Sequence, residues 1–477
     1  MSKAIARSRP QATAVSFLSL NRSSRVRAAA LLWLAMAAVA ADGRHAAAAQ
    51  TAIGSPNDIL SFAVDSLVAR ALATSPIIRS ANQRIDAARA RIGPATARPD
   101  PMVMAGIQNL PISRPGFSSD EMTMKMVGAS QTILYPGKLA LRRIAAEREV
   151  DVARVGLEVS RKRVARDVKD AYYELAFLDR ALAIVERNED VLGTFTRTTE
   201  ARYGAGVSGQ QDVLKARVEA ARLAETASDL TEQRRAAIAR LNAQLSRPSE
   251  EPVPPAEIPA VLLRAAAGDS NQVPTFTSAA LGARASDSPL HSLADLQQLA
   301  IENSPELREH EAMIAVQAAR VEVARKEYLP DFDLSAQYGQ RNRLPDMVSV
   351  TVSLAVPLQR SRKQDQVVAE ASTTLAALRE EHQTKVNEVR NEVARLVSEL
   401  ERSRTQLALT RRAILPQARA SLSSALASYQ VGKVEFLTVL DNQSTVFTYE
   451  TEYYRAIADF AKNLAELERV VGVEVLR

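Results

Sequence analysis

The chain has 477 residues and a net charge of +6, and although 46% of its residues are hydrophobic, only 4% are aromatic. Small side chains favour close packing of helix against helix rather than a bulky globular core. The chain contains no Cys, so neither a disulfide framework nor an acylated Cys is expected. Part of the positive charge lies in residues 1–49, and no nucleic-acid partner is predicted.

Residues 1–49 have the pattern of a secretory signal peptide. Arg22, Arg25 and Arg27 precede the apolar run AAALLWLAMAAVAA, and an Ala-x-Ala sequence typical of a cleavage site follows at Ala47 and Ala49. A transmembrane helix needs about 20 residues, and this apolar run is shorter. We therefore expect an exported protein.

The rest of the chain is predicted to be a duplication. Residues 50–246 form the first copy and 291–477 the second, with a Pro- and Ser-rich linker at 247–290 between them. A Ser-Pro pair that can start a helix opens each copy, at Ser75 and at Ser304. Each copy also contains the same Tyr-x-x-Gly sequence, in the middle of a helical stretch that is almost free of Gly.

An amphipathic β-hairpin is predicted in each copy after the Ser-Pro helix. In the second copy, Ser and Thr alternate strictly with an apolar row, which is Val348, Val350, Val352, Leu354 and Val356. The preceding strand, at Phe332–Tyr338, alternates in the same way. Such alternation over about ten residues is typical of strands with one wet face. The first copy has a looser version at Met102–Leu110 and Met122–Tyr135.

Two very long helices are predicted at Lys138–Thr199 and Arg360–Ser428, where Gly and Pro are almost absent. At about 1.5 Å per residue, each would be roughly 90 to 100 Å long. Gly193 and Pro416 are the expected positions of kinks. Return helices are predicted after the Tyr-x-x-Gly turns, at Asp212–Leu245 and Thr438–Val471.

The four predicted strands are long enough to cross a membrane, but four strands cannot close a barrel. An open edge in lipid leaves backbone N–H and C=O groups unpaired, at several kcal/mol each. Bacterial barrels begin at about eight strands, so the barrel must be shared between two or three chains. The apolar row would then face lipid, and the Ser/Thr row would line a wet lumen. The long helices are too polar for lipid and are expected to extend into an aqueous space.

These features together resemble the TolC family of outer-membrane efflux proteins, over essentially the whole mature chain. YQVGKVEFLTVLDNQ is similar to that family's sequence at the second helical tip. QTILYPGKLALR and the Met-rich DEMTMKMVGASQ look most like the CzcC- and CusC-type members that serve heavy-metal efflux.

The resemblance implies a mainly α fold with a membrane β-barrel portion. Three chains of four strands would share a twelve-strand barrel in the bacterial outer membrane, and a long α-helical barrel would cross the periplasm. The resemblance also implies docking to a periplasmic adaptor and an inner-membrane pump.

The two helical turns are predicted to be the adaptor-docking tips, one from each copy. Gly206 and Gly432 are expected to reverse the backbone where a Cβ would clash. The remaining tip residues are Tyr203, Tyr429 and Lys433. The alternative is a pair of ordinary helix-hairpin loops, which explains the Gly but not the matched Val-Leu pair that follows each turn.

By resemblance, the acidic ring that narrows the family's periplasmic mouth lies just after the tips. Its positions here are Thr438 and Asp441 in the second copy and Asp212 and Lys215 in the first. Asp441 matches the family's carboxylate, whereas Thr438 departs from it, and Lys215 is the expected partner of Asp212. The alternative is that both Asp residues are solvated on a helix face.

A methionine cluster accompanies the first predicted hairpin, at Met102, Met104, Met122, Met124 and Met126. It could be a soft-metal relay, since thioethers suit Cu(I), but its strand-like alternation favours packing. No metal site, cofactor or catalytic motif is predicted, and the chain is interpreted as a non-enzyme.

The leading prediction is therefore a passive outer-membrane exit duct of a tripartite efflux system, most like those for heavy metals. Ducts for multidrug efflux or type I protein secretion have the same build and remain alternatives. A soluble periplasmic coiled-coil adaptor or scaffold is an alternative of another class, although it would not need the strict alternation at 348–356.

Overall fold

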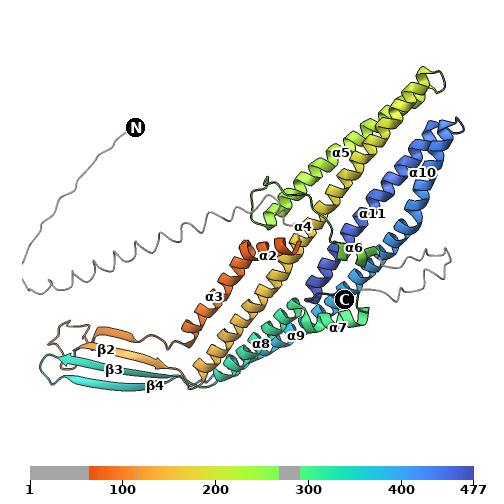
Figure 1. The fold of residues 1–477 in the computed structure, drawn as a ribbon. Coiled ribbons are helices and arrows are strands. Elements are labelled where there is room, and N and C mark those ends of the chain that lie inside the picture. The colour runs from red at the N-terminus through yellow and green to blue at the C-terminus, as the bar shows by residue number, and fades with distance from the viewer. Residues whose placement is uncertain (1–63, 114, 268–289, 477) are drawn as a thin grey trace, which may run out of the picture. The chain divides into compact units, whose positions relative to one another are not determined.

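The computed structural model describes residues 64–113, 115–267 and 290–476, and the predicted signal peptide at 1–49 lies outside them. The described part is mainly helical and carries one four-stranded antiparallel sheet, as the sequence predicts. Figure 1 shows this sheet at one end of the long helices and the two helical turns at the other. None of the helices in these ranges is long and apolar enough to span a bilayer.

The order of elements repeats once along the chain: two short helices, a β-hairpin and a long helical hairpin. The first set is α2 (Val64–Thr74), α3 (Pro76–Thr96), β1 (Met102–Gln108), β2 (Met124–Ile133), α4 (Lys138–Gly204) and α5 (Gln210–Gln244). The second set is α7 (Leu293–Asn303), α8 (Pro305–Lys326), β3 (Phe332–Arg341), β4 (Met347–Leu354), α9 (Gln364–Leu409), the π-helix η1 (Thr410–Ile414), α10 (Leu415–Gln430) and α11 (Phe436–Val471).

Each Ser-Pro pair joins two helices instead of opening the first one. Proline disfavours the α conformation of the residue before it, and Ser75 accordingly has φ −61° and ψ 128°. Its Oγ accepts a hydrogen bond from the Ile77 N–H at 3.2 Å. Ser304 makes no such cap, because its buried Oγ has no hydrogen-bond partner in the structure. The helices before the pairs, α2 and α7, were not expected from the sequence.

The predicted kinks have different outcomes. Gly193 does not interrupt α4, a single helix of 67 residues. Pro416 is the second residue of α10, two positions after the end of the π-helix η1. A proline in a helix lacks an N–H and its ring clashes with the carbonyl four residues earlier, here that of Arg412. The wider π turn relieves this clash, so the sequence correctly places an irregularity at Pro416.

The predicted linker at 247–290 is not irregular throughout, because Ala260–Ala267 form helix α6. Leu262, Ala265 and Ala266 are buried in the same core as the long helices. Arg404 of α9 donates from Nε to the Ala265 carbonyl at 3.1 Å. The AVLLRAAA sequence is a good helix former, and its apolar side chains explain why the segment packs on α9 and α11.

The sheet has the strand order β1-β2-β3-β4. Its register places Val348, Val350, Val352 and Leu354 opposite Tyr338, Ala336, Leu334 and Phe332, and therefore on one apolar face. Ser349, Thr351 and Ser353 lie on the other face, with Gln337, Ser335 and Asp333. The prediction of one apolar and one polar face is confirmed, and Val350 is 69% exposed.

The predicted apolar row is one residue too long. Val356 lies beyond the end of β4, whose last ladder partner is Phe332 at the start of β3. Pro357 follows it and cannot donate a ladder hydrogen bond. The ladder ends at Leu354 because β3 begins at its partner, Phe332.

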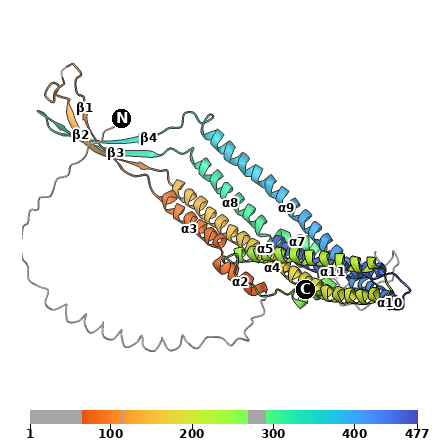
Figure 2. The ribbon, with the colours of Figure 1, turned by 90° about the horizontal axis from the view of Figure 1, so that it is seen from above.

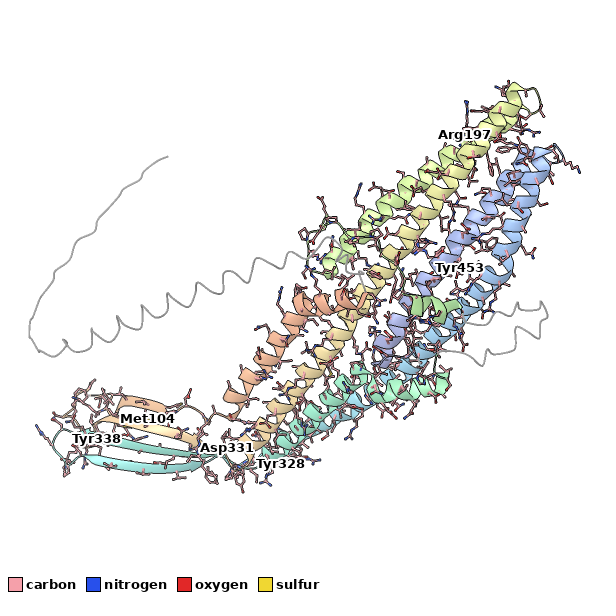
Figure 3. All side chains as sticks on the ribbon, viewed as in Figure 1. Met104, Arg197, Tyr328, Asp331, Tyr338 and Tyr453 are labelled. Carbon is pink, nitrogen blue, oxygen red and sulfur yellow. The ribbon has the colours of Figure 1, made fainter. Side chains whose placement is uncertain are left out.

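A buried cation joins the sheet to the helices. Lys138, the first residue of α4, is 3% exposed, and its Nζ lies 3.0 Å from Asp331 and 3.3 Å from Glu327. Asp331, labelled in Figure 3, also accepts a hydrogen bond from the Tyr135 N–H at 2.8 Å. Because Lys138 belongs to the first set of elements and both carboxylates to the second, this cluster holds the two strand–helix junctions together.

The two sets are also joined by ion pairs between α4 and α11. Glu174 accepts two hydrogen bonds from Arg455, at 3.0 and 2.9 Å, and another from Lys462. Burial alone raises the pKa of Glu174, but the hydrogen bond and charge of Lys462, together with Arg455, outweigh it and lower that pKa below its ordinary 4.5. The ionised carboxylate therefore stabilises the folded chain above that pH, and the stabilisation is lost as the pH falls through the lowered pKa.

We expect Glu174→Gln to destabilise the folded protein at neutral pH by about 1.5–3 kcal/mol, since charge-assisted hydrogen bonds are lost. The variant should also lose less stability than the parent when the pH falls below 4.5. Thermal unfolding in detergent between about pH 3 and pH 7 measures both effects. The control is Glu232→Gln, an exposed i,i+3 pair with Arg235, which should cost about 1 kcal/mol or less. Parallel pH profiles for parent and Glu174→Gln would contradict the assignment.

Candidate functional site

The two helical turns have the same backbone structure. The Gly206 N–H donates to the Tyr203 carbonyl at 2.9 Å, and the Gly432 N–H donates to the Tyr429 carbonyl at 3.0 Å. A longer-range bond closes each turn, from Val207 to Arg202 and from Lys433 to Ser428, both at 2.9 Å. Bonds of this kind are typical of helix C-termini. The repeated sequence therefore specifies a repeated turn.

Gly206 and Gly432 are needed for their backbone conformation, not for space. Their φ angles are 71° and 76°, in the left-handed region that favours Gly. A Cβ on Gly206 would have no neighbour within 4 Å, and one on Gly432 would only touch Arg202 at 4.0 Å. A Cβ at either position would instead crowd the backbone of the turn itself, so both positions require Gly, as the sequence predicts.

The two tyrosines of the turns have different surroundings. Tyr203 is 48% exposed, whereas Tyr429 is 6% exposed and packs against Phe436 with ring centres 5.5 Å apart. Lys433 is exposed. The Tyr203 ring of the first tip therefore lies at the surface, whereas the Tyr429 ring of the second tip is part of the core.

Arg202 of the first tip reaches across to the second tip. Its Nη1 donates to the Gln430 carbonyl at 3.1 Å, and its guanidinium lies 4.7 Å from the centre of the Tyr429 ring. The carbonyl belongs to the last residue of α10, where a cation is favourable. Sequence reasoning missed this residue. The available signal was a break in the repeat, since the position equivalent to Arg202 is Ser428.

Both tips share a small core. The hairpins α4/α5 and α10/α11 lie side by side at the end away from the sheet (Figures 1 and 2). Leu192 and Ala216 of the first hairpin are buried in one cluster with Phe436 and Val439 of the second. The tips are therefore positioned against each other within one chain.

A buried carboxylate lies further down this contact. Glu450 of α11 is 7% exposed and pairs with Arg187 of α4 and with Arg419 of α10, the latter at 2.5 Å. Asn188 of α4 also accepts a hydrogen bond from Gln443 of α11. A buried carboxylate needs such partners, because it is costly when unpaired. These contacts fix α10 and α11 on α4, and no sequence motif indicated them.

The four predicted gate residues lie on the return helices close to the tips. Thr438 and Asp441 are exposed on α11, and Asp212 and Lys215 are half-buried on α5. No ion pair joins Asp212 to Lys215 among the described residues, so that expected partnership is wrong. Asp212 lies in the first turn of α5, where the helix dipole favours a carboxylate.

The four gate positions make no ion pair with one another within the part of the chain that the structure describes. A ring of these residues therefore requires copies from neighbouring chains. Within one chain, Asp441 therefore offers an exposed carboxylate and Asp212 a half-buried one, both close to the tips.

The comparisons with known proteins agree with this architecture. The sequence matches the family model for outer membrane efflux proteins over residues 67–246 and 296–473. The cobalt-zinc-cadmium resistance protein CzcC of Cupriavidus metallidurans is 23% identical over 341 residues, which are 70% of this chain and 74% of that protein.

Solved structures show the same fold at low identity. The outer membrane protein VceC of Vibrio cholerae has a TM-score of 0.68 and 16% identity, over 86% of this chain and 96% of VceC. CusC, a protein that folds into a transmembrane channel, has a TM-score of 0.68 and 16% identity, over 87% of this chain and 93% of CusC. The prediction of a passive outer-membrane channel of the TolC type is confirmed. The chain belongs to the outer membrane efflux protein family.

Proposed function

We propose that this outer-membrane channel is the exit duct of a tripartite efflux system for heavy-metal ions. Membership of the family carries the channel function, and the similarity to the cobalt-zinc-cadmium resistance protein supports the cargo. Multidrug or type I secretion ducts remain the alternatives of the same build. A soluble periplasmic adaptor, the alternative of another class, does not agree with the family.

We further propose a homotrimer. The sheet of one chain has an apolar face and a polar face but two open edges, β1 and β4. Three chains would give about twelve strands, within the range of bacterial barrels. The apolar rows around Val350 would then face lipid, and the polar rows around Thr351 would face a lumen.

In this trimer the tips are the proposed docking surface for a periplasmic adaptor, which links the duct to an inner-membrane pump. Three copies of Asp441 would ring the inner mouth. Clustered carboxylates raise the local negative potential and attract cations, which suits a metal-ion cargo.

The function is tested in the native host by deleting the gene for this chain and measuring cell-associated Zn²⁺, Co²⁺ and Cd²⁺. We expect the deletion strain to accumulate these ions and the parent gene to restore efflux, while export of an organic dye stays unchanged. If the deletion instead abolished dye export, the parent gene restored it, and metal accumulation did not change, the metal cargo would be contradicted.

The docking surface is tested in the same strain with Gly432→Val. This variant should fail to restore efflux although its trimers form, because strain at φ 76° stays local to the tip. Full efflux by Gly432→Val would show that the second tip is not a docking surface.

The gate proposal is tested by single-channel recording in planar bilayers. Asp441→Asn removes one charge per chain from the proposed ring, so we expect lower cation selectivity and weaker block by a trivalent cation. The matched control is Asp229→Asn, an exposed carboxylate on α5 away from the tip, which should leave selectivity unchanged. Identical selectivity in the parent and in Asp441→Asn would show that Asp441 does not line the mouth.

A further inference from the structure

Five methionines lie on one face of the sheet. Direct partners in an antiparallel pair point to the same side, and the register pairs Met104 with Gly128, Met126 with Gly106 and Gly339, and Gly339 with Met347. The complete set is Met102, Met104, Met124, Met126 and Met347. This face is the one that carries Ser349, Thr351 and Ser353. The methionines therefore do not pack the apolar face, and Met102 is 65% exposed.

Glycines leave room for the thioethers. Gly339 lies between Met126 on β2 and Met347 on β4. A Cβ on Gly339 would lie only 2.6 Å from the sulfur of Met124, so that sulfur lies directly over the glycine. Three methionines thus surround one position that has no side chain of its own.

A similar gap exists at Gly128. Its partners are Met104 on β1 and Gln337 on β3, and the Gln337 Nε2 lies 3.5 Å from the Met104 sulfur. Figure 3 labels Met104 on the sheet. Here the thioether already has an amide neighbour, so the cluster around Gly339 is the better candidate for a ligand.

Thioethers are soft, neutral ligands that select Cu(I) over hard cations. The chain has no Cys, and its described residues contain no group of three or more His, Asp or Glu that could hold a metal ion. A ligand set without charge binds without releasing protons. Conduction also requires that binding be weak enough for release, which suits neutral ligands on a channel wall.

We propose that Met124, Met126 and Met347 form a binding site for a soft monovalent cation of the Cu(I) type. Its position on a lumen wall rests on the proposed trimeric duct, whereas the three ligands come from a single chain. The cation would bind on its way out, downstream of the helical mouth.

The probe is Ag(I) supplied as the nitrate, because it shares the charge and thioether preference of Cu(I) without its redox chemistry. Purified channel in nanodiscs is titrated calorimetrically in chloride-free buffer. The test variant replaces all three residues by Leu, a swap that nearly conserves volume, and the single variant Met126→Leu covers the case in which the triple variant does not assemble. We expect Ag(I) binding at this site to be lost in the triple variant, because Leu offers no donor atom, and to be weaker in the single variant.

Matched controls are Met102→Leu, on the same face but away from Gly339, and Met313→Leu on α8. Both should bind Ag(I) as the parent does. Unchanged affinity in the assembled triple variant, or in Met126→Leu if the triple variant does not assemble, would overturn the site.

Potassium nitrate conductance in planar bilayers tests the duct separately. If the parent conducts but the Leu variants bind Ag(I) normally, the proposed duct stands and the proposed thioether site is wrong. If the parent binds Ag(I) through these residues but does not conduct, the proposed thioether site stands and the proposed duct is wrong.

Discussion

The unpaired edges of the four-stranded sheet are the constraint on which the rest of the molecule depends. β1 and β4 each present a row of backbone N–H and C=O groups that no described strand of the same chain covers. In lipid every such group must be satisfied within protein, at a cost of several kcal/mol for each one left unpaired. One chain therefore cannot insert alone. In the proposed trimer, the closure that would pair β1 with β4 of a neighbour would also place the helices of neighbouring chains side by side.

A closed barrel can continue into a helical tube only if the helices are held in a fixed position relative to the sheet. Charged contacts along the chain hold them there. Lys138 ties the start of α4 to Asp331 and Glu327 next to β3. Glu174 and Glu450 then tie α11 to α4 along its length. At the far end Arg202 holds the second tip. Each contact joins the first set of elements to the second, so the two sets are held together from the sheet to the tips.

The sequence was sufficient for the features that depend on local pattern. Period-two alternation located the strands, and the repeated Tyr-x-x-Gly sequence located two turns that have the same hydrogen bonds. The alternation alone could not show that the ladder ends at Leu354, since this depends on where the partner strand begins. The short helix α6 was missed because Pro and Ser around it outweighed its own apolar sequence.

Features that depend on long-range pairing could not be predicted. Which face the methionines occupy follows from the register of β1, β2, β3 and β4, and their sequence spacing is the same for either face. The partners of Glu450 and Arg202 come from distant helices, so no local motif identifies them.

Disulfide trapping between β1 and β4 tests the central claim most directly, and the absence of native Cys gives a clean background. Val103→Cys, Ala105→Cys or Ile107→Cys is combined with Val350→Cys, to sample the register between chains. Within one chain β1 and β4 are three strand spacings apart, about 14 Å, too far for a disulfide. The account predicts that at least one pair gives, on non-reducing gels, a ladder of one, two and three chains that stops at three. Monomers at every register, or a ladder that stops at two or continues past three, would contradict it.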